Sequence, residues 1–211
     1  MAHTLFTDLE LDTLQEIMNM AFGTAAAELA EVVDVFVRLT APEVSIVPVG
    51  DLQSLLAADV PEFTDTSVVE QQFRGETDGM ALLLFPHGAE KELLSFFQPE
   101  EEDLFASDIR LELEREVLVE IGNVLIGATV GRLFELLDRR INYLPPRATG
   151  GHAFGDLLIR GRFSSDDFAI TLKAEFSFED RQVTGRMYLI NRQSAAPELR
   201  RALAEFWSTY E

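Results

Sequence analysis

Apolar residues recur every three to four positions over two long stretches of the chain, at 11–36 and 111–137. This period matches the helical turn, so the pattern predicts one long helix over about 8–37 and another that starts after Ser107 as its N-cap. Thr7 and Glu10 precede Leu11, where the apolar pattern begins, with the spacing of a capping box, in which each side chain bonds the other residue's backbone N–H. The start of the first helix is therefore well marked.

Short runs rich in β-branched and aromatic residues predict six strands, at 43–49, 66–74, 79–85, 157–163, 168–178 and 185–190. The polar turns at 75–78 and 179–182 are too short to hold a crossover helix, so we expect the strands to pair in antiparallel fashion. Shorter helical patterns follow at 89–97 and 195–210. The order of elements is a long helix, then strands, then a short helix, and it occurs twice.

The chain also repeats itself at the level of residues. A shift of 104 positions aligns nine identical residues between Leu14 and Pro42 and their counterparts, without a gap. A shift of 106 positions aligns Gly79 with Gly185 and the apolar runs that follow them. We therefore expect a single domain over 1–211 made of two repeats, about 7–103 and 104–211. The expected fold is α+β and pseudo-twofold, with two long helices packed on a continuous antiparallel sheet and short helices after each strand set.

Composition narrows the classes of function. Asp and Glu number 37 against 17 Lys and Arg, for a net charge of −20, which disfavours binding to nucleic acid or to anionic membranes. The absence of cysteine excludes disulfides, thiolate metal sites and cysteine nucleophiles. The first eleven residues are polar and acidic, and the longest apolar run, 80–85, is far too short to span a bilayer. These features predict a soluble, cytoplasmic, globular protein.

The charge is concentrated in the first repeat. Residues 1–103 carry 21 acidic and 3 basic side chains, whereas residues 104–211 carry 16 acidic and 14 basic ones. Acidic runs of this kind are usually solvated loops. The alternative is that the two halves present different electrostatic fields to a partner.

Polar residues form a narrow stripe on each long helix. At about 100° per residue, Asp12, Glu16, Asn19 and Gly23 fall within about 60° of one another, and so do Glu116, Glu120, Asn123 and Gly127. A polar stripe is normal on a surface helix. Here, however, most of the stripe is repeated while neighbours such as Gln15 and Val119 differ, and each helix carries a glycine that lowers helix stability. Two explanations fit that glycine: close approach of another chain, or a helix contact within this protein.

These residues resemble the signature of the CheC/CheX/FliY family of chemotaxis phosphatases. The pattern is Asp12-x3-Glu16-x2-Asn19-x22-Pro42, and Glu120-x2-Asn123-x22-Pro146 repeats it. Two copies in a chain of this length are most similar to the CheC type. The resemblance covers nearly the whole chain, because the duplicated order of elements matches as well.

The resemblance implies an enzyme that hydrolyses the aspartyl phosphate of a CheY-like response regulator. Asn19 and Asn123 would orient the attacking water, and Glu16 and Glu120 would pair with the regulator's lysine. The regulator supplies its own Mg²⁺, so no cofactor or metal of this chain is expected. The resemblance also implies CheD as a further partner, and the internal duplication favours a monomer.

Some positions depart from the family pattern. Glu116 stands where aspartate or serine is usual, and Met18 replaces a glycine that the second copy keeps as Gly122. Phe22 and Ile126 are bulkier than the usual alanine, so we expect them to narrow the docking surface.

A different class of function also fits, a non-catalytic module that binds a response regulator or acts as an adaptor like the switch-complex protein FliM. Such relatives usually lack the Glu-x2-Asn pair, so its presence twice favours the enzyme. Other enzyme classes have little support, because His3, His87 and His152 show no metal-ligand spacing and no P-loop or G-x-S-x-G motif occurs.

Overall fold

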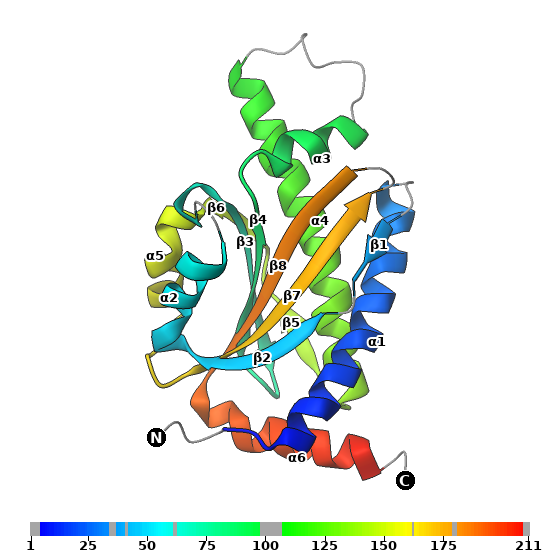
Figure 1. Cartoon of the computed structure of the whole chain (residues 1–211), viewed down its shortest axis with the longest axis vertical. Coiled ribbons are helices and arrows are strands. Elements are labelled where there is room, and N and C mark those ends of the chain that lie inside the picture. Colours follow the sequence, from blue (N-terminus) through cyan, green and yellow to red (C-terminus); the bar gives the residue numbers. More distant parts are fainter. Residues whose placement is uncertain are drawn as a thin grey trace.

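The computed structural model describes residues 5–33, 37–40, 42–60, 63–97, 107–161, 163–178 and 181–208. Its elements run through the same order twice: a long helix, two short strands, a short helix, a hairpin and a closing helix (Figure 1). The first series is α1 (Asp8–Val33), β1 (Val37–Leu39), β2 (Glu43–Pro48), α2 (Val49–Asp59), β3 (Ser67–Gly75), β4 (Gly79–Phe85) and α3 (Ala89–Phe97). The second series is α4 (Ser107–Leu136), β5 (Ile141–Tyr143), β6 (Arg147–Gly150), α5 (Phe154–Gly161), β7 (Phe168–Phe178), β8 (Arg181–Asn191) and α6 (Ala196–Ser208). This arrangement confirms the predicted α+β class.

The strands form one continuous antiparallel sheet, as predicted. Its order is β1-β7-β8-β4-β3-β5, with β2 also paired to β7 and β6 also paired to β3. The hairpins β3–β4 and β7–β8 form the centre, and the short strands cross between the two series. Strands β1 and β2 extend the hairpin of the second series, and β5 and β6 extend that of the first. Each half therefore completes an edge of the sheet that belongs to the other half.

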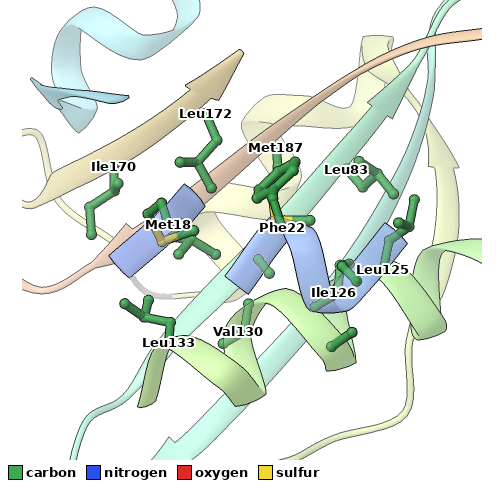
Figure 2. Packing of buried hydrophobic residues seen from close by; sticks show 14 of the residues in the cluster. Met18, Phe22, Leu83, Leu125, Ile126, Val130, Leu133, Ile170, Leu172 and Met187 are labelled. Atoms are coloured by element: carbon green, nitrogen blue, oxygen red, sulfur yellow. The ribbon is translucent and has the colours of Figure 1, made fainter. Parts of the chain in front are cut away.

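Both faces of the sheet are covered. Helices α1 and α4 lie side by side on one face, and α2 and α5 cover the other (Figure 1). Successive strand residues alternate between the layers, so Val69 packs with the long helices and Val68 with the short ones. Figure 2 shows labelled side chains of both long helices meeting the sheet: Met18, Phe22, Leu125, Ile126, Leu83 and Met187.

The predicted strand at 157–163 is wrong, because this segment belongs mostly to helix α5. Phe154 and Leu157 are both fully buried and lie three residues apart, which is helical spacing rather than strand alternation. Helix α2 was not predicted either. Its buried residues Val49, Leu52 and Leu56 have helical spacing as well. The three short strands β1, β5 and β6 were not predicted either, because three or four residues carry too little pattern.

The ends of the helices follow local signals. The capping box is confirmed: the Thr7 backbone N–H donates to Glu10 Oε2 at 2.7 Å, and the Glu10 N–H donates to Thr7 Oγ1 at 3.3 Å. Arg200 of α6 donates to the other Glu10 oxygen at 2.7 Å and ties the start of α1 to the last helix. Ser107 is the first helical residue of α4, not the residue before it. The predicted extension of α1 over 34–36 lies outside the described residues, and its last residue, Val37, belongs instead to β1.

Helix α4 contains a stretch, Ile109–Leu136, that is long and apolar enough to cross a membrane by length and composition alone. Its most apolar window has a mean hydropathy of 1.6, and 56% of that window is buried in the fold. Residues such as Leu118, Ile121 and Leu125 belong to the core shared with α1 and the sheet. Packing in this core accounts for the apolar character of α4.

Candidate functional site

The two polar stripes lie on the solvent-facing sides of α1 and α4. The exposed members are Asp12, Glu16, Gly23, Glu116, Glu120 and Asn123, and the half-buried ones are Asn19 and Gly127. The opposite sides of the same helices are buried against the sheet. The exposure that the helical spacing predicts is therefore confirmed, whereas the catalytic roles of Glu16, Asn19, Glu120 and Asn123 stay predictions.

Asn19 is held by a glutamine one turn earlier on α1. Gln15 Nε2 donates to Asn19 Oδ1 at 3.0 Å and also to the carbonyl oxygen of Pro42. Gln15 Oε1 accepts the backbone N–H of Val44 at 3.0 Å. Backbone groups at the start of β2 thus fix which way round the Gln15 amide lies, and they leave its N–H group facing Asn19.

Asn123 is held by a glutamine from a different element. Gln71 lies on β3, and its Nε2 donates to Asn123 Oδ1 at 3.1 Å and to the carbonyl oxygen of Leu144 at 3.2 Å. A carbonyl oxygen only accepts hydrogen bonds, so Leu144 fixes the orientation of the Gln71 amide. Gln71 is 3% exposed, and its Oε1 has no hydrogen-bond partner in the described part of the chain.

Both asparagine amides are consequently turned the same way. In each, a glutamine N–H faces Oδ1, so Nδ2 is the atom left for other contacts. No hydrogen bond from either Nδ2 is present among the described residues. An amide has two N–H donors and two oxygen lone pairs, so each asparagine can still offer two donors and one acceptor to a visiting molecule.

The spacing between asparagine and proline in the sequence motif has a structural counterpart. Pro42 is buried, and its carbonyl anchors Gln15 beside Asn19. In the second half, Leu144 stands two residues before Pro146, and its carbonyl anchors Gln71 beside Asn123. In both halves, the segment between the two short strands runs next to the glutamine and asparagine pair.

Neither stripe glycine is needed for packing against the described residues. A Cβ built on Gly23 or on Gly127 meets no described atom within 4 Å. Of the two explanations open from the sequence, a helix contact inside this protein is therefore not supported, and close approach by another molecule remains. Gly122 on the buried side of α4 behaves differently, because a Cβ there would lie 2.6 Å from Val69 Cγ1.

The expectation that Phe22 and Ile126 narrow the docking surface is wrong. Phe22 is 2% exposed and Ile126 is 0% exposed, and both point into the core (Figure 2). Met18 is fully buried as well, so its difference from Gly122 is a matter of how each helix packs on the sheet. These three departures from the family pattern leave the exposed stripes unchanged.

The charges around the two sites differ. Helix α1 carries six acidic and no basic residues, whereas α4 carries six acidic and three basic ones. Beside the second site, Leu94 of α3 and residues of α4 line an open groove of about 1050 Å³ that includes Arg115, Glu116 and Glu120. The first site is thus set in a more negative surface than the second.

The arrangement is suited to contact with a large partner. At both sites a carboxylate and an oriented amide lie on the outer side of a helix, which can enter a concave site on another protein. Among the described residues, no group of three His, Asp or Glu side chains is placed to hold a metal ion. The exposed carboxylates and oriented amides can hydrogen-bond and orient a group that a partner presents.

Sequence reasoning missed both glutamines. Gln15 precedes Asn19 by four residues, a helical spacing at which amide side chains meet, so a signal for it existed. The difference between Gln15 and Val119 in the repeat sets Gln15 apart from the residues that the two copies share, and so hides its contact with Asn19. Gln71 lies 52 residues from Asn123 and gave no local signal.

Comparison with known proteins gives one family match and several structures of the same fold. The CheC-like family model matches residues 9–46. FliY from Thermotoga maritima is similar with a TM-score of 0.69 and 18% identity, over 95% of this chain and 98% of that chain. FliM in the FliM–SpeE complex from H. pylori is similar with a TM-score of 0.68 and 9% identity, over 95% and 97%. The chemotaxis protein CheX from Desulfovibrio desulfuricans is similar with a TM-score of 0.50 and 11% identity, over 82% and 99%.

Proposed function

We propose that this chain, which is CheC-like over residues 9–46 and shares the fold of FliY and CheX, is a phosphatase for the aspartyl phosphate of a CheY-like response regulator. The resemblance to the CheC/CheX/FliY family is confirmed, and chemotaxis is the setting that this family indicates. The matched segment contains Glu16, Asn19 and Pro42, the residues of the first signature. The observation that carries the proposal is the Glu-x2-Asn pair on the exposed side of each long helix.

In this proposal the asparagines align the attacking water. The water oxygen attacks phosphorus, the bond from phosphorus to the aspartyl oxygen breaks, and the products are a free carboxylate and inorganic phosphate. An acyl phosphate reacts through a loose transition state, so positioning and charge neutralisation account for most of the catalysis. The regulator brings Mg²⁺ and a lysine for neutralisation, and Asn19 or Asn123 contributes alignment.

An amide suits this position better than a carboxylate. A carboxylate would add negative charge beside the phosphoryl group, whereas an amide bonds water without charge. Glu16 and Glu120 lie one helical turn before the asparagines, and they are proposed to pair with the regulator's lysine and fix the docking pose. Because α1 and α4 are anchored in the core on their inner sides, both residues are presented on a rigid support.

The location and partners follow from the same proposal. A phosphatase of this kind acts where response regulators act, so we place the chain in the cytoplasm. We propose that the chain works as a monomer, because its two halves already build one sheet with two sites. CheD as a second partner stays a prediction from the resemblance.

A second candidate function is an adaptor that binds without catalysis. The specific observation in its favour is that the FliM structure shares the fold over 95% of this chain. The Glu-x2-Asn pairs and their exposed, oriented amides favour the phosphatase.

The two candidates are separated by the decay of phosphate on a regulator. A purified CheY-like regulator, phosphorylated with a small acyl phosphate, is followed with and without this chain. We expect acceleration by the natural chain, none by the Asn19→Ala/Asn123→Ala double variant, and full acceleration by Glu28→Ala, an exposed change on α1 outside the stripe. Binding of the phosphorylated regulator without acceleration would favour the adaptor. Undiminished activity of the double variant would rule out the asparagine mechanism.

A further inference from the structure

Two glutamines from different parts of the fold contact the same atom at the two candidate sites. Gln15 reaches Asn19 Oδ1 from the same helix, and Gln71 reaches Asn123 Oδ1 from strand β3 of the other half. In each case the glutamine Nε2 also donates to a backbone carbonyl oxygen. The two sites therefore share one amide orientation, although its source differs.

The internal repeat indicates that the fold does not require either glutamine. The counterpart of Gln15 at a shift of 104 positions is Val119. The counterpart of Gln71 is Leu172, because Gln71 pairs with Ala81 in the first hairpin and Leu172 pairs with Met187 in the second. Equivalent places in the same architecture are thus filled by apolar side chains.

Gln71 is a polar side chain at a buried position. It is 3% exposed, and burying an amide costs free energy that hydrogen bonds must offset, whereas a leucine, as at the counterpart position, has no polar group to satisfy. The presence of glutamine is therefore better explained by what its Nε2 does for Asn123 than by packing.

We infer that Gln15 and Gln71 are positioning residues that hold the amides of Asn19 and Asn123 in the orientation used for hydrolysis. This inference deepens the proposed function and rests on it. The glutamine N–H groups occupy one lone pair of each Oδ1 and prevent the asparagine amide from turning over. The Nδ2 donors and the second Oδ1 lone pair then face outward, where a water and a phosphoryl oxygen would lie.

The second site depends on both halves of the chain. Strand β3 of the first series carries Gln71, and β5, which pairs with β3, leads into Leu144. Asn123 belongs to α4 of the second series. The orientation of Asn123 is thus set across the pairing between the halves, whereas the first site takes Gln15, Asn19 and Pro42 from one half.

The test isolates each site before removing its glutamine. In an Asn123→Ala background only the first site can act, and Gln15→Met removes the donor at nearly constant length. In an Asn19→Ala background only the second site can act, and Gln71→Leu introduces the residue type of the counterpart position. Gln53→Met on the exposed side of α2 is the control for the first variant. Gln72→Leu, next to Gln71 and on the other face of β3, is the control for the second.

We expect kcat for decay of the phosphorylated regulator to fall about 10- to 100-fold in each glutamine variant, with KM nearly unchanged, because alignment is lost while docking is retained. The controls should keep both parameters. Unfolding in urea should show that Gln71→Leu is at least as stable as its background. If either glutamine variant keeps its full kcat, or loses activity only through KM, that glutamine is not a positioning residue.

A second measurement tests, without any substrate, whether the glutamines restrain the asparagine amides. In ¹⁵N NMR spectra, the side-chain NH₂ groups of Asn19 and Asn123 should be ordered in the natural chain and should become mobile in the matching glutamine variant. The two measurements distinguish the failures. If the natural chain dephosphorylates no regulator, the proposed function fails. If the NH₂ groups stay equally ordered in the glutamine variants, the glutamines do not position the asparagine amides, whatever the activity.

Discussion

Gly122 and Gly127 lie on nearly opposite sides of α4. Alanine at each position tests whether that side of the helix is packed against the sheet or has room for an added methyl group. A Cβ at Gly127 meets nothing within 4 Å, whereas a Cβ at Gly122 lies 2.6, 2.9 and 3.0 Å from three Val69 side-chain atoms. Ordinary carbon contacts are about 3.5–4.0 Å. The same substitution on the same helix should therefore raise the free energy of unfolding at Gly127 but not at Gly122.

The magnitudes follow from two opposing effects. Alanine is favoured over glycine inside a helix by about 1 kcal/mol, and this gain applies at both positions. At Gly122, however, extra volume in a packed core costs about 1–3 kcal/mol, because the β-branched Val69 on the central part of β3 has little freedom to move. Gly127→Ala should thus raise stability by about 1 kcal/mol, and Gly122→Ala should leave it unchanged or lower it by up to about 2 kcal/mol.

Urea unfolding of the two variants and the natural chain measures this difference directly. Both substitutions restrict the unfolded chain alike, so that contribution cancels between them. Midpoints can be compared as stabilities only where the slope with urea is the same for all three proteins. Equal stabilisation by both variants would refute the close approach of α4 to β3 at Gly122.

The same Gly127→Ala variant, with Gly23→Ala, should weaken catalysis while stabilising the fold, since the added methyl groups lie on the docking side; kcat/KM for the phosphorylated regulator measures this. Glu16→Ala in the Asn123→Ala background should raise KM about 10-fold or more, as should Glu120→Ala in the Asn19→Ala background, because a charged pair with the regulator's lysine is lost; an unchanged KM would argue against docking through these carboxylates. The phosphoryl group that approaches each site is negatively charged, so acidic residues around the site repel it. Because α1 carries six acidic residues and no basic one, added salt should raise kcat/KM more in the Asn123→Ala background, where only the first site can act, than in the Asn19→Ala background. Desolvation raises the pKa of Glu10, but bonds from the Thr7 backbone and Arg200 outweigh it, so the folded pKa is lowered from its ordinary value. The natural chain should therefore be more stable than Glu10→Gln above the ordinary pKa of glutamate, and urea midpoints should show this advantage shrinking as pH falls through the lowered pKa.

Long periodic segments were predictable from the sequence because their signal is spread over many residues. The spacing of Leu14, Met18 and Ala21 predicted α1, and two apolar runs around a short turn predicted the hairpin of β3 and β4. Short elements were less predictable. In α5, Phe154 and Leu157 are buried and Leu158 is partly buried, and eight residues of mixed pattern resemble a strand.

The repeat could have corrected this error. Helix α2 and helix α5 occupy the same place in the order of elements, after the second short strand and before the hairpin. Leu52 and Leu56 in one copy and Leu157 in the other are parts of two weak helical patterns at equivalent places, and each pattern supports the other. Agreement between the copies carries information that neither segment holds alone.

Exposure of the stripes was also predictable, because it depends only on helical geometry, but the orientation of the asparagine amides was not. That orientation depends on which atom of a neighbour faces Oδ1, and the neighbour differs between the copies. Gln15 lies about one helical turn from Asn19, but spacing alone does not say which atom of its amide faces Asn19. The contacts with Pro42 and Val44 decide this, and they come from the folded structure.

For Gln71 the reason lies in the topology of the sheet. Strand β5 pairs with β3 rather than with a strand of its own half, and this brings Leu144 and α4 next to a residue of the first half. Strand pairing in the two hairpins makes Leu172 the counterpart of Gln71, so the repeat alone gives no reason to assign Gln71 to the site. A duplicated chain that exchanges edge strands is free to obtain the same contact from either half. The same contact made by glutamines at non-equivalent positions is thus stronger evidence of selection for the oriented amide than glutamines at equivalent positions would be, because common ancestry of the two copies does not explain it.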